Sequence, residues 1–259
     1  MPSAKVNNTE INYLFENHGK ENTLVFSNSL GTNFSMWEKQ WEEISKHFNI
    51  LFYDTRGHGK SEVTEGDYSA ELLGNDILQL TEFLGIKEFY FCGISMGGLI
   101  GQWLALSADG RLKKLIISNT AAKIGTAEGW NSRIKSVSEN GLSSILEATA
   151  ERWFTESFNK NHKNEVDGIL KNFAATPLQG YISNCAMVRD ADFRNELDKI
   201  NIPTLVISGK YDEVTTVEDG NFLQKNIRNS EHIYLETCHL SNFEKPTEFN
   251  DAVVRFLNQ

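Results

Sequence analysis

Residues 89–98, FYFCGISMGG, decide the fold of this chain. The first four are large and apolar, as expected of a strand that is buried on both faces of a parallel sheet. Gly93 and Gly97 flank Ser95 in the pattern Gly-x-Ser-x-Gly, and a helical pattern follows from Leu99. A strand, a tight glycine-rich turn and a helix in this order raise a serine hydroxyl above the end of a sheet. We therefore predict that Ser95 is a nucleophile.

The same turn provides a candidate donor for a negatively charged oxygen. The backbone amide of Met96 lies at the start of the helix, where amides have no partner within the helix. A second donor is expected from the loop after the apolar strand 24–26, where residues 27–31 read SNSLG. We expect the amide of Leu30 to take this role, since two converging amides stabilise an oxyanion. A plain tight turn is the alternative at this loop.

A nucleophilic serine requires a general base, and the chain contains six histidines. His239 is the best candidate, because it follows an expected strand at 233–235 and the loop at this place carries the base in related folds. A solvated loop histidine is the alternative. His58 lies in residues 56–59, RGHG, and we interpret it as a turn residue near the cleft rather than as the base.

The base in turn requires a carboxylate that fixes its tautomer and stabilises its protonated form. Asp212 is our choice, because it lies in the loop after the apolar strand 204–208. Glu213 is the weaker rival. The resulting chain order, Ser95 then Asp212 then His239, is that of α/β-hydrolases.

Strand and helix patterns alternate around these residues. Apolar runs and helical spacing predict an α/β fold with a mostly parallel twisted sheet flanked by helices. Residues 11–16 and 23–27 are expected to pair as a hairpin. Between 121 and 199 we find four helical patterns and no strand pattern, so we predict a core at 1–120 and 200–259 with a helical cap inserted at 121–199. Such an insertion belongs at the carboxyl ends of the strands, where open α/β sheets bind ligands.

Composition excludes other classes of protein. With 259 residues, 40% of them hydrophobic, and only 4 prolines, the chain is neither disordered nor collagen-like. A net charge of −10 disfavours nucleic acid and anionic membranes as partners. The three cysteines form no Cys-x-x-Cys pair, which argues against a zinc site and a disulfide framework. No secretion signal or long apolar run is present, so we expect a cytoplasmic protein, either a monomer or a small homo-oligomer.

Several longer motifs resemble those of 3-oxoadipate enol-lactonases, α/β-hydrolases of aromatic-acid catabolism. They cover most of the chain, including the predicted cap, and comprise residues 27–32 (SNSLGT), 53–61 (YDTRGHGKS), 91–98 (FCGISMGG), 118–125 (SNTAAKIG), 151–155 (ERWFT) and 238–242 (CHLSN). The chain departs from common forms at two places. Many hydrolases have His-Gly where this chain has Asn28-Ser29, and relatives often carry a proline near residues 214–216.

The resemblance implies that the enzyme hydrolyses 3-oxoadipate enol-lactone, a small molecule, to 3-oxoadipate. In that reaction His239 would deprotonate Ser95, and no metal or organic cofactor would be required. A carboxylesterase, a carbon–carbon-bond hydrolase or a perhydrolase would keep the same three residues. A non-catalytic ligand receptor is the alternative from another class. Haloalkane dehalogenases and epoxide hydrolases carry an aspartate in place of the serine and are therefore disfavoured.

The implied substrate carries a carboxylate, which the negative charge of the whole chain would repel. We therefore expect an arginine of the cap to bind it, since a guanidinium matches a carboxylate with two hydrogen bonds. Arg133 is the first choice, and Arg152 and Arg189 are the others. Trp130 and Trp153 are candidate walls of the pocket, with simple packing of the cap as the alternative.

Overall fold

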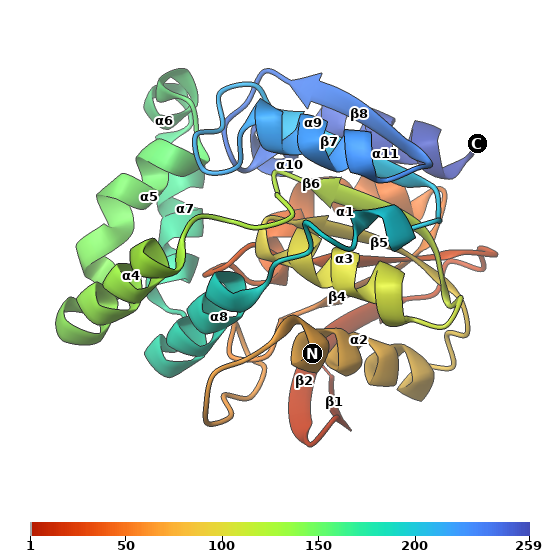
Figure 1. Ribbon diagram of the computed structural model, residues 1–259, viewed down its shortest axis with the longest axis horizontal. Coiled ribbons are helices and arrows are strands. Elements are labelled where there is room, and N and C mark those ends of the chain that lie inside the picture. Colours follow the sequence, from red (N-terminus) through yellow and green to blue (C-terminus); the bar gives the residue numbers. More distant parts are fainter. Residues whose placement is uncertain (1) are drawn as a thin grey trace.

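A single eight-stranded sheet organises the protein, and its strand order is β1-β2-β4-β3-β5-β6-β7-β8 (Figure 1). The computed structural model describes residues 2–259. The strands are β1 (Ser3–Val6), β2 (Thr9–Glu16), β3 (Thr23–Ser27), β4 (Asn49–Tyr53), β5 (Phe89–Ile94), β6 (Leu112–Ser118), β7 (Thr204–Gly209) and β8 (Ser230–Leu235). The strands from β3 to β8 run parallel, and β1 and β2 extend one edge in antiparallel fashion. The predicted mostly parallel sheet is confirmed.

The predicted hairpin between residues 11–16 and 23–27 is wrong. Strand β4 lies between β2 and β3, so these two strands are not neighbours. Every residue of β3 is buried, and a strand buried in this way needs a partner on each side, which the parallel β4 and β5 provide. Strand β2 instead forms a hairpin with β1 through Asn7 and Asn8, whose φ angles are 44° and 58°. Two successive positive φ angles are typical of a tight hairpin turn.

Helices cover both faces of the sheet. Those of the core are α1 (Glu38–Ser45), α2 (Ala70–Phe83), α3 (Met96–Ser107), α9 (Val217–Asn226), α10 (Ser241–Glu244) and α11 (Pro246–Leu257), with short 3-10 turns η1 (Phe34–Trp37) and η3 (Leu197–Lys199). Helices α2, α3 and α9 lie in front of the sheet in Figure 1, and α1 and α11 lie together behind it. Among residues 2–259 no helix combines the length and the apolar character that crossing a membrane requires.

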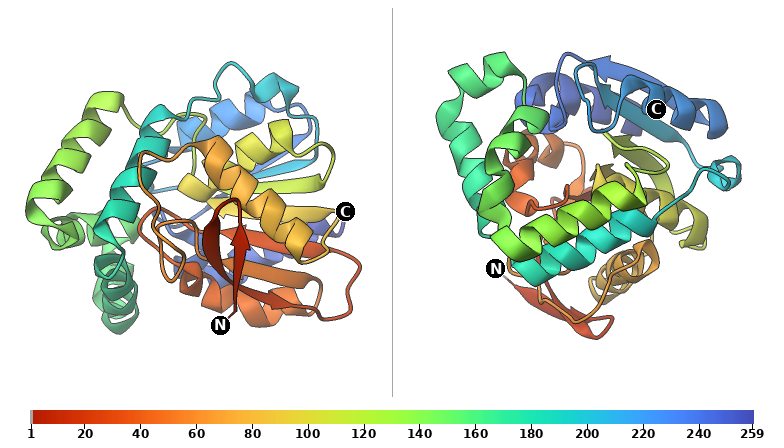
Figure 2. Two further views of the ribbon diagram at one scale, coloured as in Figure 1. Left: turned by 90° about the horizontal axis from the view of Figure 1, so that it is seen from below. Right: turned by 60° about the vertical axis from the view of Figure 1, so that its left-hand side comes forward.

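Between β6 and β7 the described chain is helical and forms no strand. The segment contains α4 (Ala127–Asn140), η2 (Leu142–Ile145), α5 (Leu146–Trp153), α6 (Glu156–Asn161), α7 (Lys163–Ala174) and α8 (Leu178–Asp190). We call α4 to α8 the cap helices. They lie on one side of the molecule (Figure 1), and α4 and α8 run side by side (Figure 2, right). The four predicted helical patterns correspond to α4, α5, α7 and α8, whereas α6 was not predicted. The limits 121 and 199 stay a prediction.

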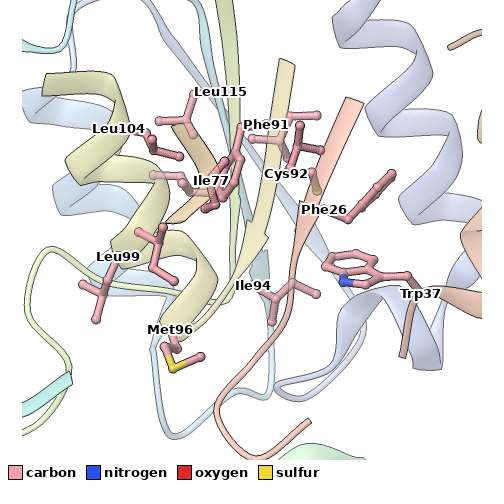
Figure 3. Packing of buried hydrophobic residues seen from close by; sticks show 14 of the residues in the cluster. Phe26, Trp37, Ile77, Phe91, Cys92, Ile94, Met96, Leu99, Leu104 and Leu115 are labelled. Atoms are coloured by element: carbon pink, nitrogen blue, oxygen red, sulfur yellow. The ribbon is translucent and has the colours of Figure 1, made fainter. Parts of the chain in front are cut away.

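The core packs on both sides of the central strands and holds β5 rigidly. Phe91 and Leu115 lie under Gly101 of α3, where an added Cβ atom would come within 3.1 Å and 2.9 Å of them. On the opposite side the rings of Phe26 and Trp37 pack at a centroid distance of 4.8 Å (Figure 3). Strand β5 therefore packs between two apolar layers, and this packing fixes the position of its carboxyl end.

Candidate active site

Ser95 occupies the sharp turn between β5 and α3. Its backbone has φ 55° and ψ −113°, a strained conformation for a residue with a side chain. Two hydrogen bonds hold it there: the amide of Ser95 donates to the carbonyl of Ser118 at 3.0 Å, and the hydroxyl of Thr120 donates to the carbonyl of Ser95 at 2.8 Å. The strand, turn and helix expected around Ser95 are thus present. Their geometry places this side chain beyond the end of the sheet.

The glycines on either side of Ser95 are required by close backbone contacts. A Cβ atom on Gly97 would lie 2.3 Å from the carbonyl oxygen of Ser27, and one on Gly93 would lie 2.2 Å from that of Gly97. Both neighbours are backbone atoms of packed segments and have no room to move. This turn therefore accepts only glycine at both positions, as the sequence pattern indicates.

Asp212 and His239, the predicted carboxylate and base, lie within hydrogen-bonding distance of each other. Nδ1 of His239 lies 2.8 Å from Oδ2 of Asp212, and the two residues are 2% and 4% exposed. An ionised carboxylate only accepts, so Nδ1 carries the proton and Nε2 is left free to accept one. The amides of Val214 and Thr215 donate to Oδ1 of Asp212 at 2.8 and 3.1 Å, which fixes the carboxylate in a loop without proline. Glu213, the rival candidate, is exposed.

The environment of Asp212 keeps its carboxylate ionised. Burial by itself would raise the pKa of Asp212, but the interaction with His239 and the hydrogen bonds from Asn119 and Thr215 outweigh it and hold this pKa below its usual value. At neutral pH the carboxylate therefore carries the negative charge that a protonated imidazole needs beside it.

Asn119 is a residue of this site that sequence reasoning missed. It follows β6 with φ 44°, and its Nδ2 donates to Oδ2 of Asp212 at 3.0 Å and to the carbonyl of Cys238 at 3.1 Å. Its Oδ1 accepts from the hydroxyl of Ser241 at 2.6 Å. Asn119 thus joins the acid loop to the loop of the base. The available signal was a polar residue directly after a buried parallel strand, because such residues gather at the same edge of the sheet.

Ser95 and His239 line one cavity, which has a volume of about 220 Å³. The core contributes these two residues and Leu30, and the cap helices contribute Arg133 and Trp153 among others. The cavity is therefore enclosed between the carboxyl ends of the strands and the cap, where the sequence predicts it.

The structure distinguishes between the three candidate arginines. Arg133 and Arg152 both line the cavity, and neither forms a salt bridge within residues 2–259. Burial and the nearby charge of Arg133 lower the pKa of Arg152. Arg189 instead pairs with Asp67 and Asp190 outside the cavity, at 3.1 and 2.7 Å. Two positive side chains that form no salt bridge with any described residue thus face the space beside Ser95.

The two candidate tryptophans also line the cavity. The indole of Trp130 donates to the carbonyl of Ile124 at 2.7 Å, and the guanidinium of Arg133 lies 5.5 Å from its ring centre. Trp153 is 6% exposed and packs edge-on against Phe173, which also lines the cavity. Each of the two rings therefore packs within the cap and also faces the cavity, so the two alternatives do not exclude each other.

The loop of Leu30 is held in place by side chains on both sides. The amide of Gly31, whose φ is 79°, donates to Nε2 of His58 at 2.8 Å. Burial lowers the pKa of His58 to about 4, so at neutral pH the ring is uncharged and accepts this bond. Nδ2 of Asn28 donates to the carbonyl of Thr32 at 2.6 Å and closes the loop. His58 is thus occupied in supporting a turn, as its sequence context indicates.

The two expected oxyanion donors are available. Within residues 2–259 the amides of Leu30 and Met96 donate to no protein acceptor, and Leu30 lines the cavity. Met96 directly follows Ser95 as the first residue of α3. Their joint role as an oxyanion hole stays a prediction. In the same described range no cluster of three or more His, Cys, Asp or Glu side chains could hold a metal ion.

Comparison with known proteins defines the class of this chain. Residues 22–246 match the family model of the alpha/beta hydrolase fold, so the chain belongs to that family. The chain is 44% identical to 3-oxoadipate enol-lactonase 2 of Acinetobacter baylyi, over 94% of this chain and 91% of that protein. It is 41% identical to 3-oxoadipate enol-lactonase 1 of the same organism, over 90% and 88%. The crystal structure of the enol-lactonase from Burkholderia xenovorans LB400 superposes with a TM-score of 0.98 at 40% identity, covering both chains completely. The resemblance seen in the sequence motifs is confirmed.

Proposed function

We propose that this protein is a serine hydrolase that opens the ring of 3-oxoadipate enol-lactone to give 3-oxoadipate, a reaction of aromatic-compound catabolism. The observation that carries this proposal is the 44% identity with an enol-lactonase over 94% of the chain, because that range includes the cap helices that line the cavity. The cavity is lined by a serine, a histidine and two arginines that form no salt bridge within residues 2–259, which suits an ester bond in a molecule that carries a carboxylate.

The reaction follows from the groups around the cavity. Nε2 of His239 takes the proton of Ser95, and Oγ of Ser95 attacks the carbonyl carbon of the lactone. The amides of Leu30 and Met96 donate to the oxygen that becomes negative. When the tetrahedral intermediate collapses, the ring C–O bond breaks and the enol oxygen leaves with the proton from Nε2 of His239, so the imidazole is neutral again. Asp212 stabilises the imidazole while it is protonated.

The second half of the reaction restores the enzyme. A water molecule gives its proton to His239 and attacks the acyl group on Ser95, and the serine leaves with a proton from the imidazole. An enol or enolate is a better leaving group than an alkoxide, so the first half demands less protonation of the leaving oxygen than ordinary ester hydrolysis does. We assign the carboxylate of the substrate to Arg133, with Arg152 beside it, because a guanidinium binds a carboxylate through two charged hydrogen bonds.

The test is a coupled assay in which muconolactone isomerase generates the enol-lactone and its loss is followed with and without this protein. We expect rapid loss with the unaltered protein and none above background with Ser95→Ala. A p-nitrophenyl acetate assay runs in parallel. A protein that releases p-nitrophenol but leaves the lactone intact is a carboxylesterase or another hydrolase of this fold. A protein inactive in both assays, with no burst of p-nitrophenol, is a ligand receptor.

We further infer a cytoplasmic enzyme that works as a monomer or small homo-oligomer. The support for this location is that Cys92, Cys185 and Cys238 are all buried free thiols, as is usual in a reducing compartment.

A further inference from the structure

Glu244 is a buried carboxylate close to His239 that the mechanism above does not use. It is the last residue of α10 and is 9% exposed. Within residues 2–259 no lysine, arginine or histidine forms a salt bridge with it. Its oxygens instead accept hydrogen bonds from the amide of Cys238 at 3.2 Å, from the amide of Thr155 at 3.4 Å and from the hydroxyl of Thr155. Among the described residues this buried carboxyl group is thus held by neutral donors, and the mechanism above gives it no role.

The donors of Glu244 belong to two segments that lie far apart in the chain. Cys238 directly precedes His239, whereas Thr155 is the N-cap residue of the cap helix α6. A second link lies on the other side of the histidine, where the amide of Leu240 donates to the carbonyl of Trp153 at 3.1 Å. Both backbone neighbours of His239 are therefore connected to residues 153–155, which lead from α5 to α6.

We propose that Glu244 is a positioning residue that links the cap segment 153–155 to the loop of His239 and so holds the imidazole at the position that serves Ser95. The hydrogen bond to Asp212 fixes the tautomer and the tilt of the ring, and the backbone that carries the ring needs restraints of its own. The carboxylate supplies one, because it accepts from both segments at once. This inference rests on the proposed role of His239 as the base.

The first test is Glu244→Gln, with the acylation rate measured from the burst of p-nitrophenol that p-nitrophenyl acetate releases. The amide keeps the size of the side chain but offers one acceptor instead of two. When its oxygen accepts from the amides of Cys238 and Thr155, its NH₂ group faces the hydroxyl of Thr155, which then loses its acceptor. We expect the acylation rate to fall about 10- to 100-fold, the range that a small misplacement of a catalytic group produces, with KM changed less than twofold. The matched control is Glu248→Gln, which removes an exposed carboxylate of α11 that pairs with Lys245, and it should leave the rate unchanged.

A second pair of variants tests the same connection by changing the residue on the cap side. Thr155→Val removes the hydroxyl that donates to Glu244 and that also accepts from the amide of Phe158 at the start of α6, and Thr155→Ser keeps both bonds. We expect Thr155→Val to slow acylation and Thr155→Ser to restore it. In the double variant Glu244→Gln/Thr155→Val the two effects should not multiply, because both changes break one connection.

The outcomes separate this proposal from the proposed function. A folded Glu244→Gln protein with an unchanged acylation rate overturns the positioning role, and so does a Thr155→Ser protein that is as slow as Thr155→Val. If Glu244→Gln does not fold, the valine and serine variants alone decide. An unaltered protein that hydrolyses the ester and not the enol-lactone contradicts the proposed substrate only, since ester acylation reports on His239 whatever the natural substrate is.

Discussion

At the scale of single residues, the candidate site depends on one carboxylate that is hydrogen-bonded from all sides. Asp212 accepts from His239, Asn119, Thr215 and the amide of Val214, and these bonds keep it ionised although it is 4% exposed. The low pKa of Asp212 has a second consequence. At pH values above the pKa of an aspartate in the unfolded chain, the ionised form of Asp212 stabilises the fold. This contribution is lost as the pH falls through the lower pKa that Asp212 has in the folded protein.

Replacement of this carboxylate tests its role directly. Asp212→Asn keeps the shape but lets the amide donate toward His239, which favours the wrong tautomer. We expect kcat to fall about 10³- to 10⁴-fold with little change in KM. Glu213→Gln, a change in the adjacent exposed carboxylate, should leave kcat unchanged. Steady-state kinetics on the enol-lactone measure both, and equal losses in the two variants would contradict the choice of Asp212.

The order of the residues along the chain was enough to predict Asp212 and His239, but it did not predict the side chains that contact them. Asp212 and His239 were both placed from the strands before them, and the structure brings the two together in a hydrogen bond. Asn119 and Glu244 were not predicted. Asn119 bonds to Asp212 over 93 residues of chain and Glu244 to Thr155 over 89, and no local pattern encodes the proximity of those segments.

At the scale of elements, the turn between β5 and α3 carries the strain of the site. Ser95 adopts a positive φ, and the neighbouring glycines let β3 and α3 approach within contact of the turn. The local pattern predicted this element because its requirements are steric and lie within a few residues. The error over the hairpin arose at the same scale. The pattern identified the strands at 11–16 and 23–27 but contained no information about which strands would pair.

A single added methyl group tests the packing of this turn. Gly97→Ala places a Cβ atom 2.3 Å from the carbonyl oxygen of Ser27, so we expect a loss of about 2 to 3 kcal/mol in the free energy of unfolding, together with a loss of activity. The matched control is Gly168→Ala in α7, where a Cβ atom meets nothing within 4 Å. There alanine should stabilise the protein by about 0.5 to 1 kcal/mol. Urea unfolding measures both; equal effects would contradict the steric argument.

At the scale of the whole molecule, the cavity is lined by positive side chains although the chain as a whole is negatively charged. The chain has a net charge of −10, yet the cavity is lined by Arg133 and Arg152, which form no salt bridge in the described part of the chain. A carboxylate that enters the cavity therefore meets positive groups in an otherwise repulsive field. Sequence reasoning predicted that a cap arginine would do this. Only the fold of the cap separated these two arginines from Arg189.

The arginines can be tested against a neutral substrate. For Arg133→Gln and Arg152→Gln we expect KM for the enol-lactone to rise about tenfold or more, since a hydrogen bond to a charged group contributes about 1.5 to 3 kcal/mol. KM for p-nitrophenyl acetate, which has no carboxylate, should stay the same. Arg189→Gln removes an arginine paired with Asp67 and Asp190 and serves as the control for both substrates. Unchanged KM values in both cavity variants would contradict the carboxylate subsite.

The sequence by itself predicted most of the strands and helices, the tight turn at Ser95 and the chain order of Ser95, Asp212 and His239. These features depend on side-chain size, periodicity and turn geometry over short stretches. The tertiary structure alone decided that β4 lies between β2 and β3 and that Arg133 and Arg152 face the cavity. It also decided that Asn119 reaches the loop of His239 and that Glu244 reaches Thr155 of the cap. These features depend on how the layers of helices and strands pack. Packing brings together residues that lie far apart in the chain, and no short stretch of sequence encodes such contacts.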